Sequence, residues 1–189
     1  IKFYDLNSHF EKTLGQIRID YLNASWLIFG DGFNQGTLRT AVKRVFDIVC
    51  ALILTVLSAP IMAITALLIK LESPGPMLYR QERVGLRGRS FMCTKFRSMC
   101  VDAEGDGVAR WASKNDPRVT RIGAFLRKSR IDELPQLWSV FTGEMSLVGP
   151  RPERPYFVEQ HLRNVPGYAE RFALLPGLTG LAQVNGEYH

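Results

Sequence analysis

Two adjacent carboxylates, Asp132 and Glu133, directly follow three cations at positions 127, 128 and 130. The helical pattern that comes next predicts Asp132 as the N-cap and Glu133 in the first helical turn. The helix dipole and the nearby cations favour the ionised form of both carboxyl groups. An ionised aspartate beside phosphate-binding arginines can act as a nucleophile, with the second carboxylate as a base or metal ligand. Simple helix capping is the alternative interpretation of this spacing.

Arg151 lies between Pro150 and Pro152. Each proline fixes a backbone angle, so the guanidinium group between them is pre-organised at low entropic cost. The planar fork of arginine matches two phosphate oxygens. The sequence therefore predicts a phosphate contact at Arg151, with a rigid loop carrying a surface arginine as the alternative.

Lys95 and Arg97 alternate with apolar residues, as in a half-buried strand whose cations share one face. Such a face can hold a diphosphate or lie against anionic lipid. Asp102 and Glu104 follow and are weaker candidates for metal ligands, because the glycines at 105 and 107 make a poorly organised setting.

These polar groups need an anchor, and residues 48–69 form a run of 22 positions without a charge. As one helix this run is roughly 33 Å long, against about 30 Å of bilayer hydrocarbon. Pro60, two residues after Ser58, removes a backbone donor and is expected to break the helix. Basic residues flank both ends and favour the cytoplasmic side. They are Arg39, Lys43 and Arg44 before the run and Lys70, Arg80 and Arg83 after it.

A re-entrant helix broken at Pro60, which enters and leaves by the same membrane face, satisfies both the proline and the flanking charges. A spanning helix and a buried core helix are the less favoured alternatives. The remaining pattern predicts a β-hairpin within residues 76–99 and helical spacing around 122–126 and 134–141. The expected fold class is therefore α+β: a re-entrant (monotopic) membrane helix plus a small, mainly helical globular domain with a short β-hairpin.

The composition of the chain limits the classes of partner and of metal site that we expect. The net charge of +6 indicates an anionic partner. Three widely separated cysteines argue against a disulfide framework and for a reducing setting. The three scattered histidines give little support to a histidine-based metal site or catalytic triad.

Taken together, the motifs resemble the bacterial sugar transferase family, the monotopic polyprenyl-phosphate phosphoglycosyl transferases. The resemblance covers roughly residues 40 to 189 and rests on five motifs in the family's order along with the proline. They are residues 43–47, Pro60, and residues 95–99, 132–137, 145–152 and 176–186.

The resemblance implies a reaction. Asp132 would attack the phosphate of a UDP-sugar, form a phosphosugar-aspartate and release UMP. Polyprenyl (undecaprenyl) phosphate would then accept the phosphosugar, in the first membrane step of exopolysaccharide or other glycoconjugate synthesis. Glu133 completes the dyad, and Mg²⁺ would bridge Asp132, Glu133 and the diphosphate. Arg127 and Arg151, together with Lys95 and Arg97, would hold substrate phosphates.

The resemblance also implies a domain plan: residues 1–40 as a linker or cap from a preceding region, 41–72 as the re-entrant helix, and 73–189 as a cytoplasmic catalytic domain truncated at its C-terminus. The expected location is the cytoplasmic face of the bacterial inner membrane. The expected partners are a UDP-sugar, polyprenyl phosphate and membrane lipids, and an oligomer is compatible with the sequence.

Two alternatives from other classes remain. A membrane-tethered basic nucleic-acid-binding module would need a recognition helix rich in exposed arginine, lysine and asparagine. The helix expected from Glu133 instead shows an apolar core face of Leu134, Leu137, Trp138 and Phe141, so no nucleic acid is expected. A non-catalytic scaffold of a polysaccharide machine is the other alternative, and only an assay separates it from an enzyme.

Overall fold

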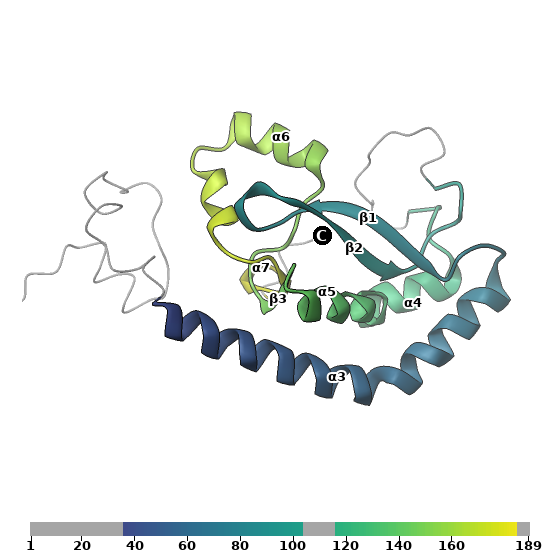
Figure 1. The fold of residues 1–189 in the computed structure, drawn as a ribbon. Helices are drawn as coiled ribbons and strands as arrows, with labels where there is room; N and C mark the ends of the chain where they lie inside the picture. Colours follow the sequence, from purple (N-terminus) through teal and green to yellow (C-terminus); the bar gives the residue numbers. More distant parts are fainter. Residues whose placement is uncertain (1–35, 104–115, 185–189) are drawn as a thin grey trace, which may run out of the picture. The chain divides into compact units, whose positions relative to one another are not determined.

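The computed structural model describes residues 36–103 and 116–184 (Figure 1). Most of the expected linker or cap, together with Glu104 and the end of the glycine-rich motif, lies outside the described residues. The chain divides into two compact units, Ile1–Lys43 and Arg44–His189. The packing described below belongs to the second unit.

Helix α3 (Thr37–Glu72) contains the whole charge-free run and continues through Pro60. Figure 1 shows a bend near the middle of this helix. A proline lacks the N–H that would bond four residues back, and its ring crowds that carbonyl, so a bend is its usual effect. Within the same region, Thr55 Oγ1 donates to the Ala51 carbonyl at 2.7 Å and Ser58 Oγ to the Thr55 carbonyl at 3.4 Å. The expected break is thus a bend in a continuous helix.

Only a narrow stripe of α3 is buried. Its members are Asp47, Ala51, Ser58, Thr65 and Ile69, spaced four or seven residues apart. The apolar side chains around this stripe are exposed, for example Leu57 at 68% and Val56 at 64%. By length and composition α3 qualifies as a membrane-crossing helix, with a mean hydropathy of 2.5 and 11% of its apolar window buried. A core helix shows the opposite pattern, so the core-helix alternative is not supported.

The expected hairpin is confirmed. Strand β1 (Leu78–Val84) pairs antiparallel with β2 (Ser90–Phe96), from Leu78 opposite Phe96 to Val84 opposite Ser90. The connection contains the short helix η3 (Leu86–Gly88). Arg87 and Gly88 there adopt left-handed backbone angles, with φ of 55° and 73°, which turn the chain tightly between the strands.

The core joins α3 to the hairpin and to three further segments: helices α4 (Arg121–Ser129) and α5 (Leu137–Thr142) and the 3-10 helix η4 (Ile131–Gln136). One cluster packs Ala51 of α3 against buried residues of β2 and α5. A second cluster consists of Ile69, Phe96 and Leu126. Helix α3 therefore contributes to both parts of the core.

The predicted helical segments are confirmed, but their predicted core faces are only partly right. Leu137 and Leu126 are buried, whereas Trp138 is 70% exposed and Phe125 is 63% exposed. The interpretation of 134–141 as one regular helix is wrong, because η4 has three residues per turn and α5 begins only at Leu137. The change of period moves Trp138 out of the core.

A small parallel sheet was not predicted. Strand β3 (Ser146–Val148) pairs with β4 (Gly177–Thr179). A Cβ added at Gly177 would lie 2.1 Å from the Gly149 nitrogen, and one added at Gly149 would lie 2.3 Å from the Leu175 carbonyl oxygen. The glycine-rich motif therefore allows two backbones to touch, and this contact sets the start of the loop that carries Arg151.

The part of α3 that belongs to the second unit, residues 44–72, makes polar side-chain contacts near both of its ends. Arg44 donates to the carbonyl oxygens of Val140 at 2.6 Å and Phe141 at 2.7 Å, at the C-terminus of α5. The Asp47 carboxylate accepts from Ser146 Oγ at 2.8 Å. At the other end, Glu72 accepts from the Ile122 backbone N–H at 3.0 Å, in the first turn of α4.

The remaining described elements are α6 (Pro155–Asn164), η5 (Tyr168–Ala173) and α7 (Leu181–Val184). Pro155 occupies the first turn of α6, where its missing N–H has no cost. All three cysteines are free thiols, as the sequence predicted. The α+β class is confirmed, with long and short helices beside two small sheets.

Candidate active site

The two carboxylates lie in η4 and are buried, with Asp132 at 6% and Glu133 at 7% exposure. The predicted N-cap role of Asp132 is wrong. Arg130 occupies the cap position in a left-handed conformation with φ of 59°, and Asp132 is in the first turn. Helix α4 ends at Ser129, and Arg130 is both its C-cap and the residue before η4. Arg130 is left-handed rather than extended, and its side chain makes no capping hydrogen bond to η4.

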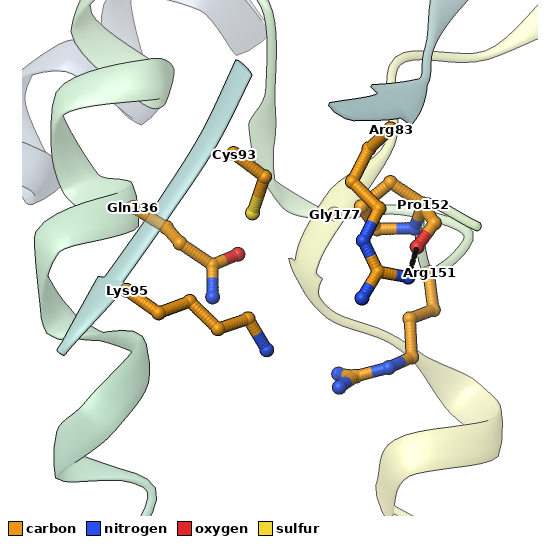
Figure 2. Close-up of a pocket in the computed structure, with 7 residues that line it drawn as sticks. All are labelled: Arg83, Cys93, Lys95, Gln136, Arg151, Pro152 and Gly177. Carbon is orange, nitrogen blue, oxygen red and sulfur yellow. Dashed lines mark hydrogen bonds between the residues drawn. The ribbon is translucent and has the colours of Figure 1, made fainter. Parts of the chain in front are cut away.

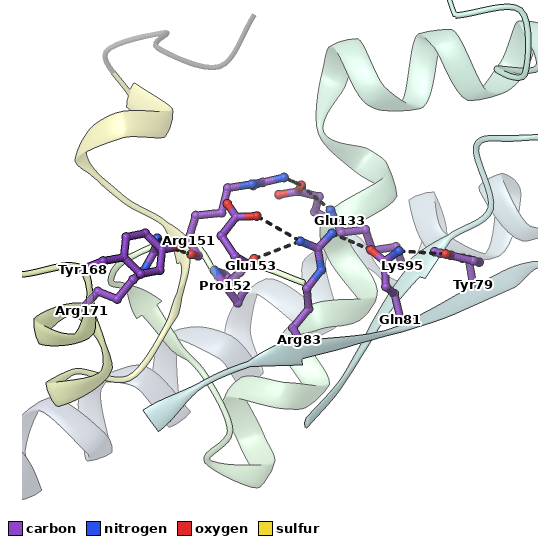
Figure 3. Close-up of polar contacts among 10 residues, drawn as sticks. All are labelled: Tyr79, Gln81, Arg83, Lys95, Glu133, Arg151, Pro152, Glu153, Tyr168 and Arg171. Atoms are coloured by element: carbon purple, nitrogen blue, oxygen red, sulfur yellow. Dashed lines mark hydrogen bonds and ion pairs between the residues drawn. The ribbon is translucent and has the colours of Figure 1, made fainter. Parts of the chain in front are cut away.

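Glu133 is the centre of a cluster of cations (Figure 3). Its Oε1 accepts from Lys95 Nζ at 2.8 Å and from an Arg151 guanidinium nitrogen at 3.0 Å, with Arg130 at 3.6 Å. Burial alone would raise the pKa of Glu133, but the charges and hydrogen bonds of Lys95 and Arg151 lower that pKa to about 2. This lowered pKa agrees with the prediction that Glu133 is ionised.

Asp132 has a different environment. Its Oδ1 is buried and has no hydrogen-bond partner in the described part of the chain. Burial raises the pKa of Asp132 and Glu133 adds to the increase, while Lys95, Arg127 and Arg130 oppose it. The cations thus act on Asp132 in the predicted direction, but burial outweighs them, and the ionisation of Asp132 stays a prediction. Its unpartnered oxygen and raised pKa are properties of a nucleophile.

A pocket opens beside these carboxylates and is called the basic pocket below (Figure 2). Side chains from both strands of the hairpin, from η4 and from the proline-flanked loop converge there. Its lining residues are Arg83, Cys93, Lys95, Gln136, Arg151, Pro152 and Gly177. Two predicted phosphate ligands, Lys95 and Arg151, thus lie in one pocket.

Arg127 lies outside this lining, in the last turn of α4. Its side chain is half-buried, and its charge lowers the pKa of Asp132. It is therefore a cation near the candidate nucleophile, and its role as a phosphate ligand stays a prediction.

Arg97 is placed elsewhere, and the prediction of a phosphate ligand is not supported by its contacts. It is 7% exposed, and its guanidinium group donates to the carbonyl oxygens of Ser73 at 2.9 Å and Pro74 at 2.7 Å, and to that of Ile69. Strand β2 ends at Phe96, so Lys95 and Arg97 do not share a strand face. Arg97 instead satisfies carbonyl groups at the C-terminal end of α3.

Sequence reasoning missed Arg83, Cys93 and Gln136 as pocket residues. Arg83 donates to the Pro152 carbonyl at 3.1 Å and to Gln81 at 2.6 Å (Figure 3). It also lies 3.6 Å from Glu153, so it braces the loop around Arg151. Burial raises the pKa of the Cys93 thiol, which favours a neutral lining group.

The fit of a magnesium ion rests on one carboxylate. Asp132 Oδ1 is a buried acceptor without a partner in the described residues, as a metal ligand requires. Glu133 Oε1 is already bonded to two cations. Among residues 36–103 and 116–184, no group of three or more protein ligands is assembled. Because magnesium commonly binds one or two carboxylates together with substrate phosphates, the site fits the ion in company with a diphosphate.

Comparisons with known proteins agree on one family. The model described as Bacterial sugar transferase matches residues 38–189. A Bacillus subtilis (strain 168) protein, provisionally named an undecaprenyl-phosphate N-acetylgalactosaminyl 1-phosphate transferase, is 56% identical over 131 residues, which are 69% of this chain and 73% of that protein.

Two further relatives are longer than this chain. The UDP-N-acetylgalactosamine-undecaprenyl-phosphate N-acetylgalactosaminephosphotransferase of Aeromonas hydrophila is 45% identical over 97% of this chain and 43% of its own length. The UDP-glucose:undecaprenyl-phosphate glucose-1-phosphate transferase of Caulobacter vibrioides is 52% identical over 76% of this chain and 54% of its own length. This chain thus spans about half of each.

Proposed function

Because the chain belongs to the bacterial sugar transferase family, we propose that it transfers a sugar 1-phosphate from a UDP-sugar to undecaprenyl phosphate. The names of its relatives support this reaction, and two of them differ in the sugar, N-acetylgalactosamine or glucose. The observation that carries the proposal is the unpartnered, buried Oδ1 of Asp132 beside the cations of the basic pocket.

In the first step the Asp132 carboxylate attacks the phosphorus that bears the sugar. The new O–P bond forms as the P–O bond to UMP breaks, and UMP leaves with the electron pair. In the second step an oxygen of undecaprenyl phosphate attacks the phosphosugar-aspartate. The Asp132–phosphorus bond breaks, the carboxylate is restored, and the lipid-linked diphosphate sugar is released.

The cations have separate parts in this scheme. Lys95 and Arg151, both within hydrogen-bond distance of Glu133, hold the phosphate oxygens, and Arg127 adds charge near Asp132. Their charges act in a partly buried pocket, where electrostatic stabilisation is stronger than in water. Glu133 fixes the positions of Lys95 and Arg151 before the substrate binds. Mg²⁺, held by Asp132 with Glu133 nearby, would neutralise charge on the diphosphate.

The membrane part of the proposal is a re-entrant α3 at the cytoplasmic face of the inner membrane. It is supported by the bend at Pro60, by the exposed apolar side chains of α3 and by the basic residues near both of its ends. In this placement the basic pocket meets a soluble UDP-sugar and a lipid phosphate at the same interface. Membrane lipids are then the surroundings of α3.

The test is UMP release from a panel of UDP-sugars by the purified protein in detergent with Mg²⁺. We expect Asp132→Asn to lower the rate by at least about 1,000-fold, with or without lipid acceptor, because the amide cannot form the covalent intermediate. Glu159→Gln, an exposed carboxylate on α6 outside the pocket, is the matched control. Full UMP release by Asp132→Asn would remove Asp132 as the nucleophile.

A further inference from the structure

Gln136 brings a second unpartnered polar group into the basic pocket. The residue is 3% exposed, and its Nε2 is buried without a hydrogen-bond partner in the part of the chain that the structure describes. Figure 2 shows its amide directed into the space bounded by Cys93, Lys95 and Arg151. A buried amide N–H that lacks a partner is costly, so its persistence in a pocket indicates a ligand that accepts from it.

The position of this amide is fixed by the core. Gln136 is the last residue of η4, and α5 begins at the next residue. Leu137 and Val140 anchor α5 at 2% and 0% exposure. A backbone change that turned the Gln136 side chain toward solvent would therefore disturb the packing of Leu137 and Val140. The same 3-10 helix also presents the unpartnered oxygen of Asp132.

The charges around the pocket identify what Gln136 binds. The walls carry three cations: Arg83 is bonded to the Pro152 carbonyl and Gln81, while Lys95 and Arg151 are bonded to Glu133. An oxygen that enters this space and accepts from a neutral amide is stabilised most if it carries negative charge. Phosphate oxygens have this property, and sugar hydroxyl groups do not.

We propose that the Gln136 side-chain amide donates a hydrogen bond to a non-bridging phosphate oxygen of the UDP-sugar and so positions the phosphorus for Asp132. This assignment rests on the proposed function. It gives the pocket a neutral donor beside its cations, and this donor does not titrate. The contact is made to a group that all UDP-sugars share, so it does not select the sugar.

The kinetic test compares Gln136→Met, which keeps the size of the side chain but removes the donor, with the wild type. Gln160→Met, on the exposed face of α6, is the matched control. For Gln136→Met we expect kcat/KM for UMP release to fall about 10- to 100-fold, as for a lost hydrogen bond to a charged group. The loss should be equal for every UDP-sugar that the wild type uses, with an unchanged pH profile and a melting temperature equal to or above that of the wild type.

A second variant, Gln136→Glu, places a carboxylate where the phosphate oxygen is expected. We expect a larger loss than in Gln136→Met near neutral pH. Relative to the wild type at the same pH, the variant should recover in part at lower pH, where the carboxyl group becomes protonated and can donate. A loss in Gln136→Met confined to one sugar, a parallel fall in melting temperature, or kcat/KM within twofold of the wild type would overturn the proposal.

A binding measurement separates this proposal from the proposed reaction. UDP with Mg²⁺ should raise the melting temperature of the wild type and of Gln160→Met, and the shift should be smaller in Gln136→Met. Wild-type protein that shows this UDP shift but releases no UMP contradicts the reaction and leaves the Gln136 contact standing. Equal UDP shifts in the wild type and Gln136→Met contradict the contact.

Discussion

At the residue scale, two adjacent carboxyl groups with the same exposure differ in their partners. Glu133 is bonded to Lys95 and Arg151, and its pKa is lowered to about 2. Asp132 has an unpartnered oxygen, and burial raises its pKa. This separation of pKa values supports the proposed roles, in which Glu133 organises cations and Asp132 forms the covalent bond.

The raised pKa of Asp132 predicts the acid limb of the pH profile. Attack requires the carboxylate, so kcat/KM should fall as the pH decreases through that pKa, at a higher pH than for an ordinary aspartate. Lys95→Met removes a charge that lowers the pKa of Asp132, so the limb should move further upward. We also expect about a 10-fold or greater loss of kcat/KM at the optimum.

The measurement is UMP release against pH at low UDP-sugar concentration for the wild type, Lys95→Met and the exposed control Lys128→Met. A limb that stays in place, or moves to lower pH, in Lys95→Met contradicts the assignment of the limb to Asp132.

At the element scale, Arg97 connects the hairpin to the end of α3. Its guanidinium group donates hydrogen bonds to the carbonyl oxygens of three residues and to the Ser73 hydroxyl. The last carbonyl groups of a helix have no partners within the helix, so a buried cation at this point satisfies them and complements the helix dipole.

We expect Arg97→Met to lower the free energy of unfolding by about 2–4 kcal/mol, because it strands buried carbonyl groups. The fraction that remains folded should keep the wild-type KM for the UDP-sugar, since Arg97 does not line the basic pocket. Arg80→Met, an exposed position on β1, is the control. Thermal unfolding and UMP kinetics on the same preparations check both parts, and an increased KM with normal stability would restore the phosphate role.

Periodic patterns predicted the hairpin, the helical segments and the long apolar helix, because each depends on local spacing. They did not predict η4, since its three-residue period begins after the left-handed Arg130. The strand pair β3–β4 joins segments about thirty residues apart through glycine contacts that carry no apolar pattern. The motifs singled out Lys95 and Arg151, which line the same pocket, whereas the end of β2 at Phe96 places Arg97 elsewhere.

At the scale of the whole molecule, α3 has one face in the core and another that is exposed. A narrow stripe of it completes both core clusters, and its remaining apolar surface is left exposed. Helix α5 carries no lysine or arginine, and Trp138 is its large exposed apolar side chain. This helix therefore lacks the composition of a recognition helix for nucleic acid.

The re-entrant placement predicts a labelling pattern in intact cells. Single cysteines at Thr40 and Leu71, in a background with the three native cysteines replaced, should react with a membrane-impermeant reagent only after the cells are opened. Both positions are exposed and lie near opposite ends of α3. Reaction of one position in intact cells and of the other only in opened cells would show a spanning helix and exclude the re-entrant one.

The burial of Ala51 and Ile69 has a practical consequence for handling the protein. Ala51 packs in the core cluster of Phe91 and Val140, and Ile69 packs in the cluster of Leu126. Helix α3 is therefore part of the folded core, in addition to its proposed role as an anchor. A truncated form that begins after residue 72 would open two apolar hollows. It would also remove the Ile69 carbonyl that accepts from Arg97 and the Asp47 carboxylate that accepts from Ser146. Replacing the outward-facing side chains of α3 with polar ones is therefore a better way to solubilise the protein than cutting the helix away, because both core clusters contain residues of α3.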